Sequence, residues 1–382
     1  MDEMKSLAVY CGGQRVGTLA RYKRQLAAFE YDKEWLRDGF AISPFSLPLR
    51  SGVFIPKAEP FEGLFGVFAD SLPDGWGRLL VDRVMLKNGL HPEQMGNFER
   101  LAIVGNSGMG ALCYKPEWKL DSHCSDLDLD KIAEQCRMVL QADSMEPIDE
   151  LFRMGGSSGG ARPKILTSMD GEEWLIKFPS VEDRSDIGCQ EYVYSMCAKA
   201  CGIEMEETKL FDSNKCRGYF GTRRFDRGRN AQGREIRYHM ISASALLETS
   251  HRIPNLDYDV LMKLTMKLTG EFSQLEKLYR LMCFNVFAHN RDDHSKNFSY
   301  LYDNSSNMWK LSPAYDLTYS NSLGGEHATT VHGNGKNPGI SDLLAVAEEA
   351  GLSVKWAEET AETVRECVRK KLGQYLGETK YT

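Results

Sequence analysis

Short apolar runs separated by turn residues dominate the first part of the chain and predict short β-strands. The apolar run Leu7–Cys11 is followed by Gly12-Gly13, a pair typical of a tight turn, so residues 6–18 are expected to form a β-hairpin. Two further runs, Phe40–Ser43 and Gly52–Ile55, predict two more short strands with proline-rich connections.

Helical periodicity first appears after this β-rich start. Apolar side chains recur at helical spacing between Trp76 and Lys87, which predicts a helix with Ser71 or Asp74 as its N-terminal cap. A second helix is expected over residues 129–140, after a polar and acidic stretch at 115–130 that indicates a surface link between domains.

The rest of the chain changes from strands to helices. Residues 165–179 and 207–240 are strand-rich in pattern, with a helix from Glu191 to Ala200 between them. From Ala243 onward the pattern is helical. We expect helices over 256–267, 271–289, 343–350 and 357–376, with a strand at Met308–Leu311. A β-rich half followed by an α-rich half is the signature of the α+β class.

Composition and charge narrow the possible functions. The 382 residues are 42% hydrophobic and 26% charged, which is ordinary for a globular protein, and the length suggests two or three domains. A net charge of −7 disfavours a free-standing nucleic-acid binder. No apolar run reaches the ~20 residues that a membrane span needs, and the first residues lack the features of a signal peptide. The protein is therefore expected to be cytoplasmic, without a membrane partner.

The ten cysteines are scattered, without a CxxC pair. Cys197 and Cys201 are one helical turn apart, and we interpret them as packed small hydrophobic residues, not as a zinc or disulfide site.

The strongest chemical signal is the segment His289–Asn297, which directly follows an apolar helix. Its Asn, Asp and Ser residues disfavour a continued helix, so an exposed loop is expected. Protein kinases need an aspartate that orients the substrate hydroxyl and an asparagine five residues later that binds magnesium, and Asp292 and Asn297 have this spacing. Lys296 is placed to neutralise phosphate charge. A polar loop that only caps helices and a His-Asp-Asp-His zinc site are the alternatives.

A second acid downstream extends this interpretation. Kinases hold magnesium with another aspartate after the loop, and Asp316 follows the expected strand at Met308–Leu311. Asp316 is not followed by the usual Phe-Gly. Only its distance from Asn297 and its order in the chain support the interpretation of Asp316 as a magnesium ligand.

Upstream, residues 155–164 form a glycine-rich segment whose backbone amides can approach phosphate oxygens. It matches neither of the common phosphate-loop patterns, and a flexible linker is the alternative. Lys177 lies on an apolar strand after it, which suits pairing with phosphates, although an outward-facing strand lysine has the same pattern. Glu191, at the expected start of the next helix, is the candidate ion-pair partner of Lys177.

Taken in order, several motifs resemble the HipA family of serine/threonine protein kinases, which are the toxins of bacterial toxin–antitoxin pairs. The motifs are Gly-Ser-Ser-Gly-Gly-Ala-Arg-Pro-Lys, Ile-Lys-Phe-Pro, Phe225-Asp226-Arg227, Asn290–Phe298 and Tyr315-Asp316-Leu317, and Phe-Ala-Asp-Ser-Leu-Pro-Asp-Gly-Trp-Gly resembles the family's N-terminal subdomain. The resemblance covers roughly residues 5–370.

The resemblance implies a bilobed protein-kinase-like fold of the α+β class. It implies an N-terminal β-rich HipA-type subdomain (1–115), a region like a kinase N-lobe with the glycine-rich segment (116–242), and an all-α C-terminal lobe with the catalytic loop (243–382). Members use ATP and Mg²⁺, phosphorylate serine or threonine, with aminoacyl-tRNA synthetases as a known target class, and bind a helix-turn-helix antitoxin (HipB-like) that binds operator DNA.

Residue roles follow from the same resemblance. It implies Asp292 as the catalytic base, with Lys177 and Glu191 as the ion pair that positions phosphate, and Asn297 and Asp316 as magnesium ligands. It implies autophosphorylation of Ser157, with Ser158 as the adjacent competitor. The residues expected around the nucleotide are Gly159, Gly160, Ala161, Arg162, Pro163, Lys164, Lys177, Ile241, Ala243, His294, Ser295, Lys296, Asn297, Tyr315 and Asp316.

One segment departs from the family pattern. Many members have an acidic Gln-Glu-Asp stretch where adenine binds, and this chain has Met240-Ile241-Ser242-Ala243 there. Backbone groups would then hold the adenine edge. The competing functions are a small-molecule kinase of the aminoglycoside-phosphotransferase type and a catalytically silent scaffold that binds an antitoxin.

Overall fold

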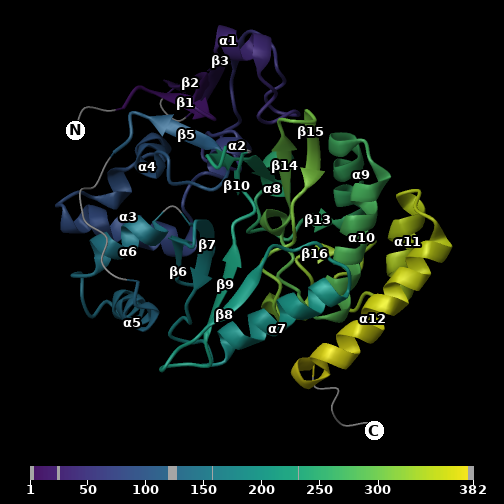
Figure 1. Cartoon of the computed structure of the whole chain (residues 1–382). Coiled ribbons are helices and arrows are strands. Elements are labelled where there is room, and N and C mark those ends of the chain that lie inside the picture. Colours follow the sequence, from purple (N-terminus) through teal and green to yellow (C-terminus); the bar gives the residue numbers. More distant parts are fainter. Residues whose placement is uncertain (1–3, 24–25, 119–126, 157, 231, 377–382) are drawn as a thin grey trace. The chain divides into compact units, whose positions relative to one another are not determined.

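The structure is a computed structural model that describes residues 4–23, 26–118, 127–156, 158–230 and 232–376 (Figure 1). The chain divides into two compact units. Unit 1 comprises Met1–Gly188, Lys209–Ile241 and Ala245–Glu248, and unit 2 comprises Cys189–Thr208, Ser242–Ser244 and Thr249–Thr382. The finer division at residues 115 and 242 stays a prediction, and the expected link at 115–130 lies partly outside the described residues.

Unit 1 begins with a five-stranded sheet in the order β4-β3-β2-β1-β5. Its strands are β1 (Ser6–Cys11), β2 (Gln14–Tyr22), β3 (Leu26–Tyr31), β4 (Val53–Phe54) and β5 (Leu112–Lys115). The expected hairpin is confirmed, because Cys11 pairs with Gln14 across Gly12 and Gly13. Both glycines have positive φ, 58° and 84°, which the tight hairpin turn requires.

The expected strand at Phe40–Ser43 is wrong. Backbone groups of Phe40 and Ile42 bond to side chains, and Ser43 forms only an isolated bridge with Leu47. Trp35 Nε1 donates to Phe40 O at 2.9 Å, the Tyr31 hydroxyl accepts from Ile42 N at 3.2 Å, and His239 Nε2 donates to Ile42 O at 2.7 Å. Side chains from distant segments thus satisfy a run whose pattern alone predicts a strand.

The second sheet of unit 1 has the order β6-β7-β9-β8. Its strands are β6 (Lys164–Met169), β7 (Glu172–Lys177), β8 (Thr208–Phe211) and β9 (Tyr219–Arg223). Helices α3 (Gly75–Lys87), α5 (Leu129–Leu140) and α6 (Ile148–Gly155) share one core with this sheet. That core is formed by Trp76, Leu80, Val84, Ile132, Cys136, Val139, Ile148, Leu151, Ile165, Trp174, Ile176, Phe178, Phe211 and Tyr219. The helices predicted over 76–87 and 129–140 are confirmed.

The other elements around unit 1 are short. They are α1 (Lys33–Asp38), α2 (Gly66–Ala69), the 3₁₀ turn η1 (Pro92–Gln94), α4 (Asn97–Val104), β10 (Arg227–Arg229), β11 (Glu235–Arg237), β12 (His239–Ser242) and α8 (Ala243–Leu246). A buried ion cluster holds part of this unit together. The Asp226 carboxylate accepts from Arg224 at 2.8 Å, from Arg227 at 2.7 Å and from the Gly110 amide at 2.6 Å. Because all the donors are charged or backbone groups, this buried carboxylate is well compensated.

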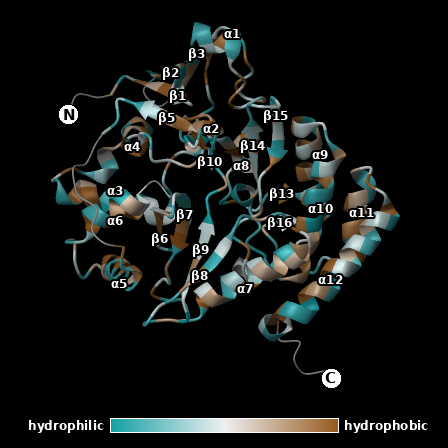
Figure 2. Ribbon diagram, in the orientation of Figure 1, coloured by the Kyte–Doolittle hydropathy of each residue, from teal (hydrophilic) through white to brown (hydrophobic). Residues whose placement is uncertain are grey.

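Unit 2 is mainly helical. It holds α7 (Ile187–Ala200, continued from the end of unit 1), α9 (Tyr258–Thr269), α10 (Phe272–Phe287), α11 (Ile340–Glu349) and α12 (Val354–Leu376). The side chains that α12 buries are spaced by three or four residues, and polar and apolar positions alternate along it in Figure 2. All five predicted helices of this region are confirmed within a few residues.

Short strands are added to these helices, so an all-α description of this region is incomplete. Strand β13 (Leu256–Asp257) pairs with β16 (Thr329–Thr330), and β14 (Ser299–Asp303) pairs with β15 (Met308–Leu311), the strand expected from sequence. The 3₁₀ turns η2 (Ser295–Asn297) and η3 (Leu323–Gly325) lie in the connections. No helix in the described part of the chain has the length and apolar composition of a membrane span.

Candidate functional site

The loop at residues 289–297 forms because α10 ends at Phe287 and the chain turns at His289. His289 has a positive φ of 52°, a conformation that cannot continue a right-handed helix. Residues 290–294 are non-helical, the turn η2 covers Ser295–Asn297, and β14 follows. A non-helical loop therefore follows the apolar helix as expected, but it is exposed only at Asp292, and Asn290, Asp293 and Ser295 are buried.

The two adjacent aspartates of this loop have opposite environments. The Asp292 side chain is 64% exposed, whereas the Asp293 side chain is fully buried. Asp293 accepts hydrogen bonds from His327 Nδ1 at 2.9 Å, from the Tyr258 hydroxyl at 3.0 Å and from the Thr329 amide at 3.1 Å. Asp293 is thus an anchor of the loop, and Asp292 is the aspartate that a substrate can reach.

Tyr258, one of the donors to this anchor, is held in its protonated form. Burial and the charge of Asp293 raise the pKa of Tyr258, so its phenol stays protonated and donates. Asn285 donates to the same Tyr258 oxygen at 2.9 Å and accepts from the Asn290 amide at 2.9 Å. A connected network therefore fixes the first half of the loop on α9 and α10.

Asn297 closes the loop on itself. Its Nδ2 donates to the backbone oxygen of Asp292 at 2.7 Å, which orients the amide. The amide oxygen is then the atom that a hard cation such as Mg²⁺ would use.

The segment that carries Asp316 is tied to the loop on both sides of this residue. The Tyr315 hydroxyl donates to Lys296 O at 2.6 Å and lies 2.6 Å from Ser299 Oγ. On the other side, Ser320 N donates to His289 O at 3.0 Å. Asp316 itself has φ 55°, an uncommon conformation for a non-glycine residue. The structure therefore brings the segments of Asp292, Asn297 and Asp316 together within unit 2.

The other loop residues flank this group. His294 Nε2 lies 3.9 Å from Asp292 Oδ1, and its ring packs 5.4 Å from the ring of His251. Ser295 is buried and Lys296 is half-buried. Within the described residues, the loop's histidines and aspartates do not form a group of three metal donors, so the His-Asp-Asp-His zinc alternative has no geometric support.

In unit 1 the glycine-rich segment runs from the end of α6 to the start of β6, and residues 74–77 hold it. The Asp74 carboxylate accepts from the Gly160 amide, and Trp76 N donates to Gly160 O at 2.9 Å. The Trp76 indole donates to Lys164 O at 3.1 Å. Asp74 stands at the N-terminal cap position of α3 but makes no side-chain cap bond, so it positions the segment instead.

Close packing at this contact requires glycine. A Cβ at Gly77 would lie 2.2 Å from Ser158 O, and one at Gly75 would lie 2.3 Å from Gly160 O. Sequence reasoning did not connect these two segments. The available signal was the pair of glycines on either side of Trp76 at a helix start, where glycine is otherwise unfavourable.

The two candidate serines differ in what the structure describes. Ser157 lies outside the described residues. Ser158 is 1% exposed, and its hydroxyl donates to Gly155 O at 2.6 Å. Ser158 is therefore poorly placed to receive a phosphate in this conformation.

Two lysines lie opposite each other at the end of the glycine-rich segment. Lys164 on β6 pairs in register with Lys177 on β7, so both side chains lie on one face of the sheet. Lys164 Nζ donates to Gly159 O, and the Lys177 ammonium lies 5.7 Å from the centre of the Phe220 ring. Two cationic side chains on one face of a strand end are groups of the kind that can hold a phosphate.

The remaining predicted residues lie in different environments, and their proposed roles stay predictions. Arg162 forms an ion pair with Asp183 at 3.0 Å, Pro163 is buried and Ala161 is exposed. Glu191 is 2% exposed and lies in the second turn of α7, which begins at Ile187, so it is not at the helix start. Glu191 belongs to unit 2 and Lys177 to unit 1, and their pairing stays a prediction.

The segment expected at adenine is buried. Ile241 and Ala243 are both 0% exposed. Within unit 2, the Ala243 amide donates to Phe298 O at 2.8 Å and is thus satisfied inside the chain.

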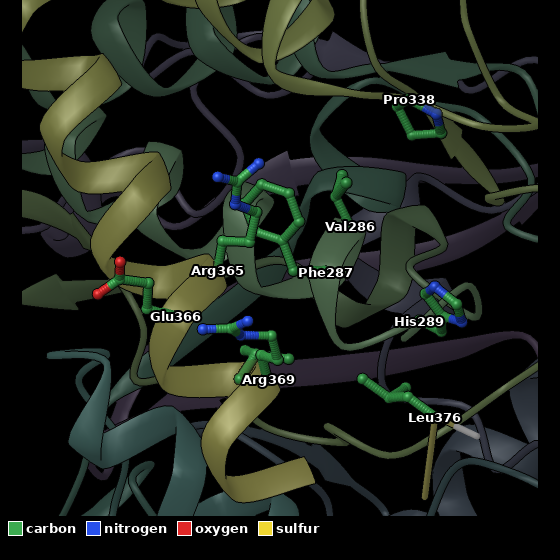
Figure 3. Close-up of a pocket in the computed structure, with 9 residues that line it drawn as sticks. Val286, Phe287, His289, Pro338, Arg365, Glu366, Arg369 and Leu376 are labelled. Atoms are coloured by element: carbon green, nitrogen blue, oxygen red, sulfur yellow. The ribbon is translucent and has the colours of Figure 1, made fainter. Parts of the chain in front are cut away.

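Unit 2 also contains a cavity of about 460 Å³ between the end of α10 and α12. Figure 3 shows Arg365, Glu366 and Arg369 on α12, with Phe287 at the end of α10 and His289 at the start of the loop that follows. Apart from this contact with the loop, none of the residues predicted for catalysis or nucleotide binding lines the cavity.

Sequence comparison defines the family to which the chain belongs. Residues 7–115 match the HipA N-terminal domain, and residues 156–372 match the HipA-like C-terminal domain. The chain belongs to the HipA family.

Individual relatives agree with this membership. "Putative kinase Y4mE" of Sinorhizobium fredii (strain NBRC 101917 / NGR234) is 26% identical over 348 residues, which cover 82% of this chain and 77% of the relative. The fold is similar to that of HipA from Shewanella oneidensis MR-1, solved in complex with HipB and operator DNA. The TM-score is 0.72 at 16% identity, over 98% of this chain and 92% of that chain. The Helicobacter pylori proinflammatory kinase CtkA matches only weakly, with a TM-score of 0.36.

Proposed function

We propose that this protein is an ATP- and Mg²⁺-dependent serine/threonine protein kinase that acts as the toxin of a toxin–antitoxin pair. The observation that carries the proposal is the assembly of Asp292, Asn297 and the Asp316 segment in unit 2, at kinase spacing and linked by hydrogen bonds. Family membership supports the same function, because the relative Y4mE is described as a kinase.

Each side chain has a role in this proposal. Asp292, exposed and next to the anchored Asp293, orients the hydroxyl of the substrate and accepts its proton. Asn297 and Asp316 supply the hard oxygen ligands for Mg²⁺, which would neutralise charge on the transferred phosphate. Lys164, Lys177 and the amides of the glycine-rich segment would hold the phosphates of ATP, and Glu191 would orient Lys177.

The biological role rests on the family. The HipA relative of known structure is in complex with HipB and operator DNA. We infer that this chain likewise binds a small helix-turn-helix antitoxin and, through it, operator DNA. A translation component such as an aminoacyl-tRNA synthetase is the proposed substrate, and the cytoplasm the proposed site of action.

Self-inhibition by phosphorylation of Ser157 completes the proposal. A phosphate there would add a charge of about −1.5 to −2 in a segment whose amides are expected to bind ATP phosphates. The Gly160 amide already donates to the Asp74 carboxylate, which shows that the segment accommodates an anionic group. A phosphate on Ser157 would also be an anionic group in this segment, and it would compete with the phosphates of ATP for the same amides.

Brief induction of the wild-type protein and of Asp292→Asn, followed by phosphoproteomics, tests the proposal. Wild type should arrest growth and add phosphate to Ser157 and to at least one translation protein, and Asp292→Asn should do neither. Phosphate on Ser157 of the Asp292→Asn protein would show that another kinase places it, and self-inhibition would be refuted. Identical phosphoproteomes with equally folded proteins would refute the kinase function.

A further inference from the structure

Three cysteines from two distant segments converge inside unit 2. Cys197 lies on α7, Cys201 directly follows this helix, and Cys367 lies on α12. Their sulfur atoms all lie within 4.8 Å of one another. Cys197 and Cys201 are 0% and 3% exposed, and Cys367 is half-buried. Within the described residues, this is the group of three or more metal-donor side chains that the fold brings together.

We propose that Cys197, Cys201 and Cys367 form a three-thiolate site for a thiophilic d¹⁰ cation, Zn²⁺ or Cu⁺. A metal–sulfur bond of about 2.3 Å places sulfurs about 3.8 Å apart around a tetrahedral ion. The observed separations of up to 4.8 Å require only small side-chain rotations to reach that geometry. Soft thiolates select these ions over Mg²⁺, so the site is distinct from the proposed magnesium ligands.

The charges around the site act in both directions: the Cys197 thiol and burial raise the pKa of Cys201, and burial raises the pKa of Cys367, so a metal ion would have to displace these thiol protons. The ammonium of Lys371, one turn after Cys367 on α12, acts on both Cys197 and Cys367. Three thiolates and one Zn²⁺ have a net charge of −1, and Lys371 offsets this charge. A buried anionic cluster without such a cation would be costly.

The packing of three cysteines as small hydrophobic groups is the simpler reading, and it was the expectation for Cys197 and Cys201. It explains why two cysteines four residues apart at the end of α7 are buried, but it does not require the third thiol to come from α12. A disulfide would join two of the sulfurs and leave the third out. Convergence of all three on one point is what a metal ion needs.

The coordination number separates the two candidate ions. No fourth histidine, cysteine or carboxylate donor among the described residues joins the group. Cu⁺ can be satisfied by three thiolates, whereas Zn²⁺ would take a solvent molecule as its fourth ligand on the half-exposed side at Cys367. Either ion would cross-link α7 to α12 and stabilise unit 2.

The test uses the reduced full-length protein. Metal-free protein is titrated with Zn²⁺, with Cu⁺ and with Co²⁺ as a spectroscopic probe, and thiols protected from alkylation are identified by mass spectrometry. Wild type should bind one equivalent of Zn²⁺ or Cu⁺, raise its Tm on binding, and protect Cys197, Cys201 and Cys367. Thiolate-to-Co²⁺ charge-transfer absorption together with tetrahedral d–d bands would identify a zinc-type site. Tight binding of one Cu⁺ per protein without these Co²⁺ bands would identify a copper-type site.

Serine variants complete the test. Cys197→Ser, Cys201→Ser and Cys367→Ser should each weaken binding at least 10-fold, while Cys189→Ser, also on α7 but outside the group, should not. Absence of stoichiometric Zn²⁺ or Cu⁺ binding by folded wild type would overturn the proposal. Metal binding with a different set of protected thiols would also overturn it, and this result does not depend on the folding of any variant.

Discussion

Asp292 and Asp293 are adjacent and have the same side chain, but their different contacts give them different roles. Asp293 is enclosed by donors from Tyr258, His327 and Thr329, while the Asp292 side chain is mostly exposed. Removing an acceptor from a buried network leaves its donors unsatisfied, whereas changing an exposed carboxylate costs little stability.

The first prediction separates the two residues by stability. Asp293→Ala should lower the free energy of unfolding by about 3 kcal/mol, because His327 and Tyr258 lose their buried acceptor. Asp292→Asn is the matched control and should change it by less than about 0.5 kcal/mol. Urea denaturation of the purified proteins measures both, and equal losses would contradict the assignment of Asp293 as the anchor.

The second prediction concerns the proposed metal ligands. Asn297→Ala and Asp316→Ala should weaken ATP binding in Mg²⁺ more than ATP binding in EDTA, because both residues offer oxygen ligands that Mg²⁺ prefers. Calorimetric titration under both conditions measures this, with Asp303→Ala at the end of β14 as the control. Equal weakening with and without metal would indicate a folding defect and no metal role.

For single residues, the sequence reveals spacing along the chain but not contacts between distant segments. The spacing of Asp292 and Asn297 lies within one loop, and spacing is visible in a sequence. The role of Asp293 depends on His327 and Thr329, which a sequence pattern does not place. The same holds for Cys367, whose partners lie in another segment: Cys197 on α7 and Cys201 directly after it.

Among the elements, the glycine-rich segment is the one whose position depends most on another part of unit 1. Asp74 and Trp76 bond to Gly160, and Gly77 packs against the backbone of Ser158. The N-terminal region therefore positions a segment proposed to bind phosphate.

The third prediction tests this contact. In Gly77→Ala the new Cβ would lie 2.2 Å from Ser158 O, so the segment must shift. We expect a loss of about 1–3 kcal/mol in unfolding free energy from overpacking, and weaker ATP binding. Gly373→Ala on α12, where nothing lies within 4 Å, is the matched control and should be neutral or stabilising. Unchanged ATP affinity in folded Gly77→Ala would contradict the role of this contact.

The fourth prediction concerns pH and the segment at Phe40–Ser43, which His239 holds. Burial lowers the pKa of His239 to about 4 from its ordinary value of 6.5. The folded state keeps His239 neutral while the unfolded state protonates it, so stability is lost as the pH falls from about 6.5 to about 4. The full effect is about 3 kcal/mol.

His239→Gln keeps a donor for Ile42 O but does not titrate. The Tm of wild type should therefore fall more steeply than that of His239→Gln between pH 6.5 and pH 4.5. Parallel Tm curves for the two proteins would contradict the assignment of a buried, neutral His239.

Prediction of elements from sequence succeeded where the pattern is local and failed where distant side chains decide. Helix α5 and strand β15 have the predicted bounds, because periodicity and turn residues mark them. Phe40–Ser43 is not a strand because Trp35, Tyr31 and His239 satisfy its backbone. Asp74 was a candidate helix cap, but its carboxylate accepts a hydrogen bond from the Gly160 amide and makes no cap bond to α3.

For the whole molecule, the sequence motifs and the sequence comparison both indicate the HipA family, and the fold has the α+β class that the motifs predict. The N-terminal match at residues 7–115 is informative, because an aminoglycoside-type small-molecule kinase has no reason to carry a HipA N-terminal domain. The substrate and the antitoxin depend on surfaces, which neither motif spacing nor fold specifies.

Phosphoryl transfer by purified protein tests the central claim most directly. Wild type and Asp292→Asn would be incubated with γ-labelled ATP and Mg²⁺, and label in protein would be followed over time, after equal folding has been confirmed by circular dichroism. Loss of the group that orients the attacking hydroxyl should reduce the rate by about 10²–10⁴-fold. Equal rates for the two proteins would contradict the assignment of Asp292, and with it the proposed kinase site.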